Sequence, residues 1–219
     1  MPVLFLLGDS TCAHKTDSAR PETGWGECFE PYLAPGFEIV NLAVNGRSTE
    51  MAIHEGIFMK CFTQSRKGDW VIIQYGHNES KPEVYRRTTP YGTYQLNLRI
   101  MASNLMKKGV NVVFASSIAR RKFEGGVCVD THGDYPAAIK ALADELGIPF
   151  IEMSERTRSL LNSEGEEKSL RFFMNFGPDL YPNYPEGRED NTHLRPEGAA
   201  MVASLIAEGC REKKLPFVK

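Results

Sequence analysis

The sequence lacks any long hydrophobic run. Its longest apolar segment near the N-terminus, Val3 to Leu7, is far shorter than the ~20 residues that a membrane-spanning helix needs. The same region has neither the basic flank nor the small-residue cleavage site of a secretory signal. We therefore expect no membrane partner, and a location either in the cytoplasm or outside the cell after removal of a leader.

An excess of charge of one sign is also missing. The chain carries 26 Lys and Arg against 28 Asp and Glu, which gives a formal net charge of -2. No overall field therefore favours nucleic acid as a partner. The length of 219 residues suits one well-buried domain over residues 1–219, acting as a monomer or a homodimer.

Paired cysteines are absent as well. The five cysteines are odd in number, and none forms a CxxC motif or has zinc-ligand spacing with histidine. They are Cys12, Cys28, Cys61, Cys128 and Cys210. We expect no metal, and we expect small apolar core residues in a reducing compartment. A disulfide between Cys12 and Cys28 stays open.

What the chain does contain is an alternation of short apolar runs and longer segments with helical periodicity. Near-continuous hydrophobicity is typical of strands in a sheet that is covered on both faces. The predicted strands are Val3–Leu7, Glu38–Leu42, Trp70–Gln74, Asn111–Ala115 and Pro149–Glu152. The predicted helices are Tyr91–Lys108, Tyr135–Leu146 and Pro196–Lys214. This order predicts a three-layer α/β/α domain with a mostly parallel, five-stranded sheet.

The segment from Ser163 to Asp190 breaks the alternation. It places five aromatic residues among prolines and glycines: Phe172, Phe173, Phe176, Tyr181 and Tyr184. A linker would not be this aromatic, so we predict a long ordered loop. Its rings could stack on sugars, cover the core or bury a dimer contact.

A serine follows the first strand directly, in Gly8-Asp9-Ser10-Thr11. Reactive groups in α/β sheets lie at the carboxyl ends of the strands. A serine nucleophile needs a base that is oriented by a third group, and Asp190-Asn191-Thr192-His193 offers both. A separation of three residues brings Asp190 and His193 together within one helical turn. We predict Ser10 as the nucleophile, His193 as its base and Asp190 as the orienting acid.

Hydrolysis of an ester also needs donors for a tetrahedral oxyanion. The segment after the second strand is Asn45-Gly46-Arg47-Ser48, in which Gly46 permits close approach of the backbone. The segment after the third strand is Gly76-His77-Asn78-Glu79, in which the Asn78 amide can donate. Three segments that follow three strands therefore converge on one reaction.

The set Gly8-Asp9-Ser10, Gly46, Gly76-x-Asn78 and Asp190-x-x-His193 resembles the four blocks of the SGNH/GDSL hydrolases. Further segments resemble the rhamnogalacturonan acetylesterases within that superfamily. These are Gly24-Trp25-Gly26-Glu27, Asn45-Gly46-Arg47-Ser48, Gln74-Tyr75-Gly76-His77-Asn78, Lys108-Gly109, Arg120-Arg121, His132-Gly133-Asp134-Tyr135 and Asp190-Asn191-Thr192-His193-Leu194.

This resemblance implies a flavodoxin-like fold and hydrolysis of an ester without metal or cofactor, typically an acetyl group on a pectic sugar. It implies oxyanion donors at the Ser10 N–H, the Gly46 N–H and the Asn78 side chain. One position departs from the branch: Glu79 stands where aspartate is usual, which adds a methylene to the turn that aims Asn78.

Other residues near these motifs have competing interpretations. Trp25 could stack on a sugar or fill the core, and Arg47 could bind a uronate carboxylate or form a salt bridge. His77 is a candidate for substrate contact, although the resemblance puts it behind the reacting groups. Asp9 is expected to stabilise its own turn. Three histidines have no paired acid at a spacing that suggests catalysis and are predicted at the surface or at caps: His14, His54 and His132.

The sequence therefore predicts a serine esterase that deacetylates an oligosaccharide or polysaccharide through an acyl-serine intermediate. One rival hypothesis is an esterase, lipase or thioesterase of the same machinery that acts on other short acyl groups. A second is a catalytically silent carbohydrate-binding domain.

Overall fold

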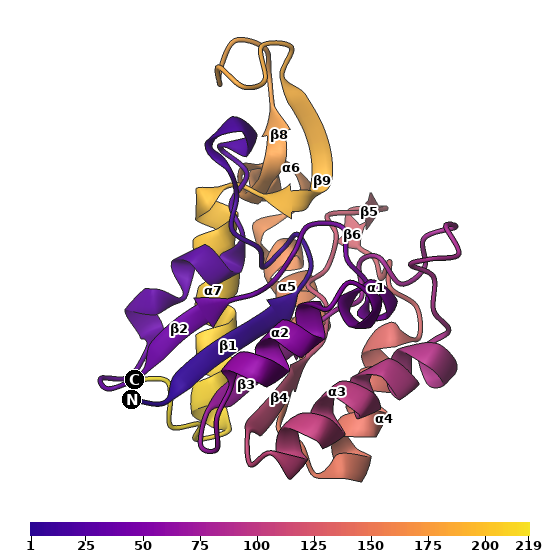
Figure 1. The fold of residues 1–219 in the computed structure, drawn as a ribbon. Coiled ribbons are helices and arrows are strands. Elements are labelled where there is room, and N and C mark those ends of the chain that lie inside the picture. The colour runs from indigo at the N-terminus through magenta and orange to yellow at the C-terminus, as the bar shows by residue number, and fades with distance from the viewer.

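The computed structural model describes residues 1–219, and a five-stranded parallel sheet lies at its centre (Figure 1). Its strands, in the spatial order β2-β1-β3-β4-β7, are Glu38–Asn41, Val3–Gly8, Trp70–Gln74, Asn111–Ala115 and Phe150–Ile151. Every neighbouring pair is parallel. All five predicted strands are present within two residues of their predicted ends, and the predicted α/β class is confirmed.

Side chains of β1 alternate between two buried cores. Leu4 and Leu6 pack in a core with α7, whereas Phe5 and Leu7 pack in a core with α3 and α4. The helices are α1 Thr49–His54, α2 Ile57–Gln64, α3 Gln95–Lys107, α4 Tyr135–Leu146, α5 Met153–Glu164, α6 Glu166–Ser169 and α7 Pro196–Glu212. Both sheet faces are thus covered, which is why the inner strands β1, β3 and β4 are mostly apolar, whereas the edge strand β2 is only partly buried.

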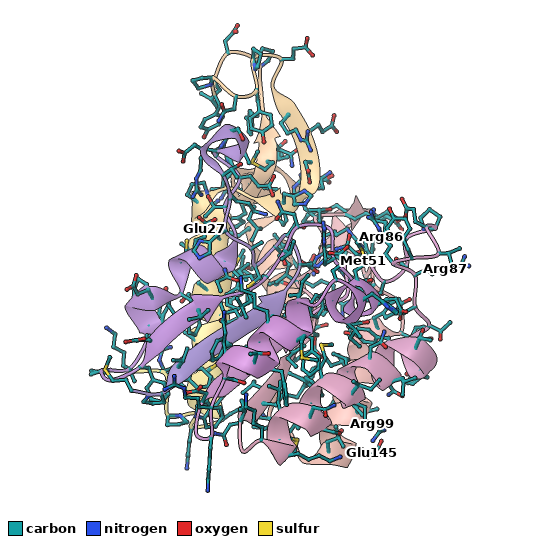
Figure 2. The ribbon with its side chains drawn as sticks, viewed as in Figure 1. Glu27, Met51, Arg86, Arg87, Arg99 and Glu145 are labelled. Carbon is teal, nitrogen blue, oxygen red and sulfur yellow. The ribbon has the colours of Figure 1, made fainter.

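Of the predicted helices, Tyr135–Leu146 is confirmed at both ends as α4. Tyr91–Lys108 is divided, because Gly92 has non-helical angles (φ -112°, ψ -108°) and a π-helical turn at Pro90–Tyr94 precedes α3. An exposed ion pair, Arg99–Glu145 (2.6 Å), joins α3 to α4 on the outer surface (Figure 2). Pro196–Lys214 is present as α7, which ends at Glu212, and helices α1, α2, α5 and α6 are additions to the prediction.

The prediction of a long loop from Ser163 to Asp190 is wrong. That segment contains the end of α5, α6, a 3₁₀ turn and a hairpin of β8 (Phe173–Phe176) and β9 (Arg188–Leu194). The hairpin projects above the carboxyl edge of the sheet (Figure 1). A second small pair, β5 (Phe123–Glu124) with β6 (Val127–Cys128), lies near the same edge.

The hairpin divides the aromatic residues into two groups. Phe172 and Phe173 are buried in the core shared with α7. Phe176 packs edge-on against Tyr181 and Tyr184, with ring centroids 4.6 and 5.7 Å apart. We call Phe176, Tyr181 and Tyr184 the hairpin cluster. Its rings are only partly buried, so they are the ones that a ligand can reach.

All five cysteines are free thiols, and four of them are buried. Cys12 and Cys28 do not form the disulfide that the sequence analysis left as a possibility. None of the helices combines the length and the apolar character that crossing a bilayer would require.

Candidate active site

Ser10 lies in the turn that follows β1. The Asp9 carbonyl accepts hydrogen bonds from the backbone of Cys12 and Ala13 (both 3.1 Å). The Asp9 carboxylate accepts from the Thr11 N–H (3.0 Å) and hydroxyl (2.9 Å). Asp9 thus stabilises the turn, as the sequence predicted, and it fixes the backbone on both sides of Ser10.

Asp190 and His193 lie in a bulge of β9, which corrects the helical turn expected from their spacing. Met174 pairs with Asp190, but the preceding residue Phe173 pairs with Leu194, so three residues of β9 have no partner in β8. The Asp190 Oδ1 accepts hydrogen bonds from the backbone N–H groups of Thr192 (2.8 Å) and His193 (3.0 Å). The bulge turns the His193 side chain back toward the carboxylate that caps it.

Side chains outside the hairpin hold this bulge in place. The Asn191 amide oxygen accepts from Asn175 (2.8 Å) on β8 and from the guanidinium of Arg121 (3.1 Å). The Arg121 backbone N–H donates to the Asn191 carbonyl (2.8 Å). The position of His193 is therefore fixed by the segment after β4 as well as by the hairpin itself.

The structure brings the three predicted triad residues together. His193 Nδ1 lies 2.8 Å from Asp190 Oδ2, and His193 Nε2 lies 3.0 Å from Ser10 Oγ. Both contacts are satisfied when Nδ1 carries the proton, because Nε2 then accepts from the Ser10 hydroxyl. This is the geometry that an activated serine requires.

The electrostatics favour a basic imidazole. Burial lowers the pKa of His193, but the hydrogen bond and negative charge of Asp190 outweigh burial, and the net shift is upward. Glu22 raises the pKa of His193 further, whereas Lys15 lowers it. Burial raises the pKa of Asp190, but hydrogen bonds and charge from His193 hold it well below its usual range.

The two oxyanion candidates lie on adjoining loops. Gly46 has φ +75° in the loop after β2, and nothing lies within 4 Å of the place where a Cβ would be. Asn78 Nδ2 donates to the carbonyl of Arg47 (3.0 Å), the residue after Gly46. The Asn78 amide has a second hydrogen that this bond leaves available.

Two residues predicted as substrate contacts are buried instead. Trp25 is 1% exposed, and its indole N–H donates to Gln74 Oε1 (2.7 Å) at the end of β3. It fills the core because its 3₁₀ turn, Trp25–Cys28, packs against α7. Glu27, which is labelled in Figure 2, belongs to the same turn. His77 is also buried and cannot touch a substrate directly. Arg47 remains partly exposed, and its Nε lies 2.8 Å from Glu55 Oε2.

His77 belongs to a second, enclosed histidine group. Its Nδ1 lies 3.1 Å from Asp9 Oδ2, and its ring meets the ring of His132 edge-on at 4.7 Å. His132 is buried, which corrects its predicted surface or capping position, and burial lowers its pKa to about 2. His14 and His54 are exposed, as predicted.

The buried carboxyl of Glu79 explains the departure from the usual aspartate. It accepts from the backbone N–H of Thr49 (2.8 Å), the first residue of α1, and from the hydroxyls of Thr88 (2.9 Å) and Thr49 (3.4 Å). Burial raises the pKa of Glu79 to about 8, with hydrogen bonds opposing. Glu79 therefore ties the turn that carries Asn78 to two neighbouring segments.

Lys15 is a site residue that the sequence analysis missed. Its side chain is fully buried, and its ammonium contacts the Ser10 carbonyl, Asn45 Oδ1 (2.7 Å) and Glu22 Oε1 (2.8 Å). Lysine is among the residues least often buried, so its sequence position gave no signal. The sequence showed only that Lys15 lies five residues from Ser10, which does not by itself predict that the two are in contact.

Comparison with known proteins places the chain in a family of hydrolases. The GDSL-like Lipase/Acylhydrolase family matches residues 6–201. The rhamnogalacturonan acetylesterase RhgT of Bacillus subtilis is 42% identical over 98% of this chain and 91% of its own length. A probable rhamnogalacturonan acetylesterase of the same organism, YesY, is 32% identical over 99% of this chain and 95% of its own.

Solved structures share the fold. The YXIM protein of Bacillus subtilis superimposes with a TM-score of 0.84 at 21% identity over 99% of this chain, which spans 58% of that protein. Acetylxylan esterase Axe2 of Geobacillus stearothermophilus gives a TM-score of 0.64 at 17% identity, over 100% of this chain and 96% of its own. The family match covers Ser10, Asp190 and His193 alike. The chain therefore belongs to the GDSL-like lipase/acylhydrolase family and is a carboxylic ester hydrolase.

Proposed function

We propose that this chain removes acetyl groups from a carbohydrate of the rhamnogalacturonan type, with Ser10, His193 and Asp190 as its catalytic triad. The observation that carries the proposal is the continuous path from Asp190 through His193 to the Ser10 hydroxyl, with contacts of 2.8 and 3.0 Å. The names of RhgT and YesY support the carbohydrate and the acetyl group.

Acylation begins when Ser10 Oγ attacks the acetyl carbonyl and His193 Nε2 takes the hydroxyl proton. Asp190 holds the resulting imidazolium and keeps its orientation. The tetrahedral intermediate collapses as His193 gives that proton to the departing sugar oxygen, which leaves acetyl-Ser10. Water then loses a proton to His193, attacks the acetyl carbon and releases acetic acid, and His193 returns the proton to Ser10.

The oxyanion of each tetrahedral intermediate needs donors that are already in place. We assign these to the Ser10 N–H, the Gly46 N–H and the free hydrogen of the Asn78 amide. The bond from Asn78 to the Arg47 carbonyl supports this assignment, because it couples the two loops that carry the donors.

Sugar units beyond the reacting acetyl group have two candidate contacts. The hairpin cluster offers partly exposed aromatic faces next to the strand that carries His193. Arg47 is held by Glu55 in an exposed ion pair, and exposed pairs contribute only ~0–1 kcal/mol. A uronate carboxylate can therefore replace Glu55 at little cost.

Acetate release from acetylated rhamnogalacturonan, acetylated xylan and free acetylated sugars tests the substrate class. We expect rhamnogalacturonan to be the best substrate, and aryl acetate to be hydrolysed faster than aryl butyrate or octanoate. Each methylene that does not fit costs ~1–3 kcal/mol in a small pocket. A preference for medium-chain esters would point to the rival lipase-like activity, and no turnover would point to a binding domain.

Ser10→Ala tests the nucleophile in the same assay. The variant should fold and lose about 10⁴-fold or more in turnover, the scale seen when an activated serine is removed. An organophosphonate should label the parent at Ser10 and leave the variant unlabelled. Aryl acetate hydrolysis within tenfold of the parent would contradict the assignment.

A further inference from the structure

The ammonium of Lys15 is enclosed by oxygen atoms from three segments. Its three acceptors are the Ser10 carbonyl, Asn45 Oδ1 and Glu22 Oε1. An ammonium has three hydrogens, so every donor is used. A buried charge is tolerated only with such pairing, and each contact therefore restrains the segment that provides it.

Two of these segments carry groups of the proposed reaction. Ser10 provides the nucleophile, and Asn45 immediately precedes Gly46. The chain of contacts continues through Arg47, whose carbonyl accepts from Asn78. Lys15 is thus the first link between the turn after β1 and the loops after β2 and β3.

The third segment brings a compensating charge close to His193. Glu22 lies next to Thr23, whose backbone N–H donates to the Leu194 carbonyl (2.9 Å) beside His193. The charges of Glu22 and Lys15 act on the His193 pKa in opposite directions. The remaining charged group in contact with the triad is Arg188, which lies 3.2 Å from Asp190 Oδ2.

We propose that Lys15 is a positioning residue that sets the separation between Ser10 and the oxyanion-hole loops, and that Glu22 balances its charge beside His193. This inference rests on the proposed triad and oxyanion hole. Without the ammonium, the Asn45–Gly46 loop loses its direct tether to Ser10. Donors that miss the oxyanion by even ~1 Å can cost about 10²-fold in rate.

The principal test is Lys15→Met, which keeps the length of the side chain and removes its charge and donors. On aryl acetate we expect kcat to fall about 10²-fold with KM within about threefold, because the donors act on the transition state. The matched control is Lys140→Met on α4, which removes an exposed lysine paired with Asp144 and should leave both constants unchanged.

The pH profile separates positioning from a general loss of structure. Removing the Lys15 charge should move the acidic limb of kcat/KM to higher pH, and Glu22→Gln should move it to lower pH. Lys15→Met combined with Glu22→Gln should return the limb toward the parent while kcat stays low. Limbs that do not move, or that move in the same direction, would overturn the proposed balance of charge.

A second, less disruptive variant tests the proposal if Lys15→Met does not fold. Asn45→Ala removes one acceptor from an exposed position and should lower kcat about tenfold at nearly constant KM, the scale of one lost hydrogen bond. A folded Lys15→Met with kcat close to the parent, or an Asn45→Ala variant with unchanged kcat, would overturn the tether. An active Ser10→Ala would instead overturn the proposed function itself.

Discussion

The molecule contains two aspartate–histidine pairs of nearly equal geometry. Asp9 and His77 are 3.1 Å apart, and Asp190 and His193 are 2.8 Å apart. Each carboxylate also accepts a hydrogen bond from the backbone N–H two residues along the chain. The local bonding alone does not distinguish the pairs.

Their surroundings differ. The His77 side chain is 3% exposed and its Nε2 has no hydrogen-bond partner, whereas the His193 side chain is 28% exposed and its Nε2 faces Ser10 Oγ. The buried pair joins the residues that directly precede Ser10 and Asn78. In the accessible pair, His193 Nε2 faces the Ser10 hydroxyl and can take its proton. Reactivity therefore depends on what the second imidazole nitrogen meets.

Replacing each acid with its amide is the strongest way to break this comparison. Asp190→Asn should lower kcat about 10⁴-fold, because the amide no longer enforces the reactive tautomer of His193. Asp9→Asn should instead cost about 1–3 kcal/mol in the free energy of unfolding, because a buried network loses a partner. Aryl acetate kinetics and urea melts measure the two effects. Equal losses of kcat in both variants would contradict the distinction.

Variants of the adjacent residues His77 and Asn78 test the same difference between a buried, structural group and a reactive one. Asn78→Ala should lower kcat about 10²–10³-fold with little change in KM, since its amide bond strengthens as the oxyanion forms. His77→Phe, at the adjacent position, should act mainly on the melting temperature. A change confined to KM in Asn78→Ala would mean that Asn78 merely binds substrate.

The pH dependence of His193 should also differ from that of His132, the buried ring that meets His77 edge-on. Because the pKa of His193 is raised, activity should fall as pH decreases through a midpoint above the ordinary histidine value of about 6.5. The loss should approach tenfold per pH unit, because only neutral His193 can accept the proton. His132, with a pKa of about 2, should stay neutral throughout. Ring-proton NMR titration would test both, and protonation of His132 near pH 6 would refute its burial.

Glu79→Gln should have the smallest effect on turnover, and its effect should appear in the pH dependence of stability. Its pKa rises to about 8 on folding, so the folded chain binds the proton more tightly than the unfolded chain. The stability that this provides is complete below the unfolded pKa of about 4.3 and is lost as pH rises toward 8. Glu79→Gln mimics the protonated acid and should flatten this decline in thermal melts. Exposed Glu186→Gln is the control, and an unchanged slope in Glu79→Gln would contradict the shift.

The predictable features were those that the sequence encodes locally. Five apolar runs predicted the strands because burial on both faces requires continuous hydrophobicity. The motif at the end of the first strand placed Ser10 at the edge of the sheet where parallel strands end, whereas His193 reaches the same edge on a hairpin outside that sheet. Helix α4 was predicted at both ends, since its apolar stripe stops at Gly147, which adopts φ +66°.

The features that were missed depend on contacts between distant segments. Trp25 lies in a 3₁₀ turn without apolar periodicity, and only α7 and Gln74 make its position a core position. The β8–β9 hairpin escaped because a three-residue bulge disrupts its alternation. Lys15 and His132 are buried by partners that their neighbours in the sequence do not reveal.

Ser10 and His193, the proposed nucleophile and its base, are 183 residues apart in the chain. At about 5–20 residues per second, a ribosome adds His193 roughly 10–40 s after it has added Ser10. β1 also lies between β2 and β3 in the sheet. The turn that carries Ser10 is therefore flanked by its neighbouring loops only after both of those strands have been synthesised and have paired with β1. A chain that ends before the β9 bulge should therefore hydrolyse nothing, and aryl acetate assays on such truncated chains would show this.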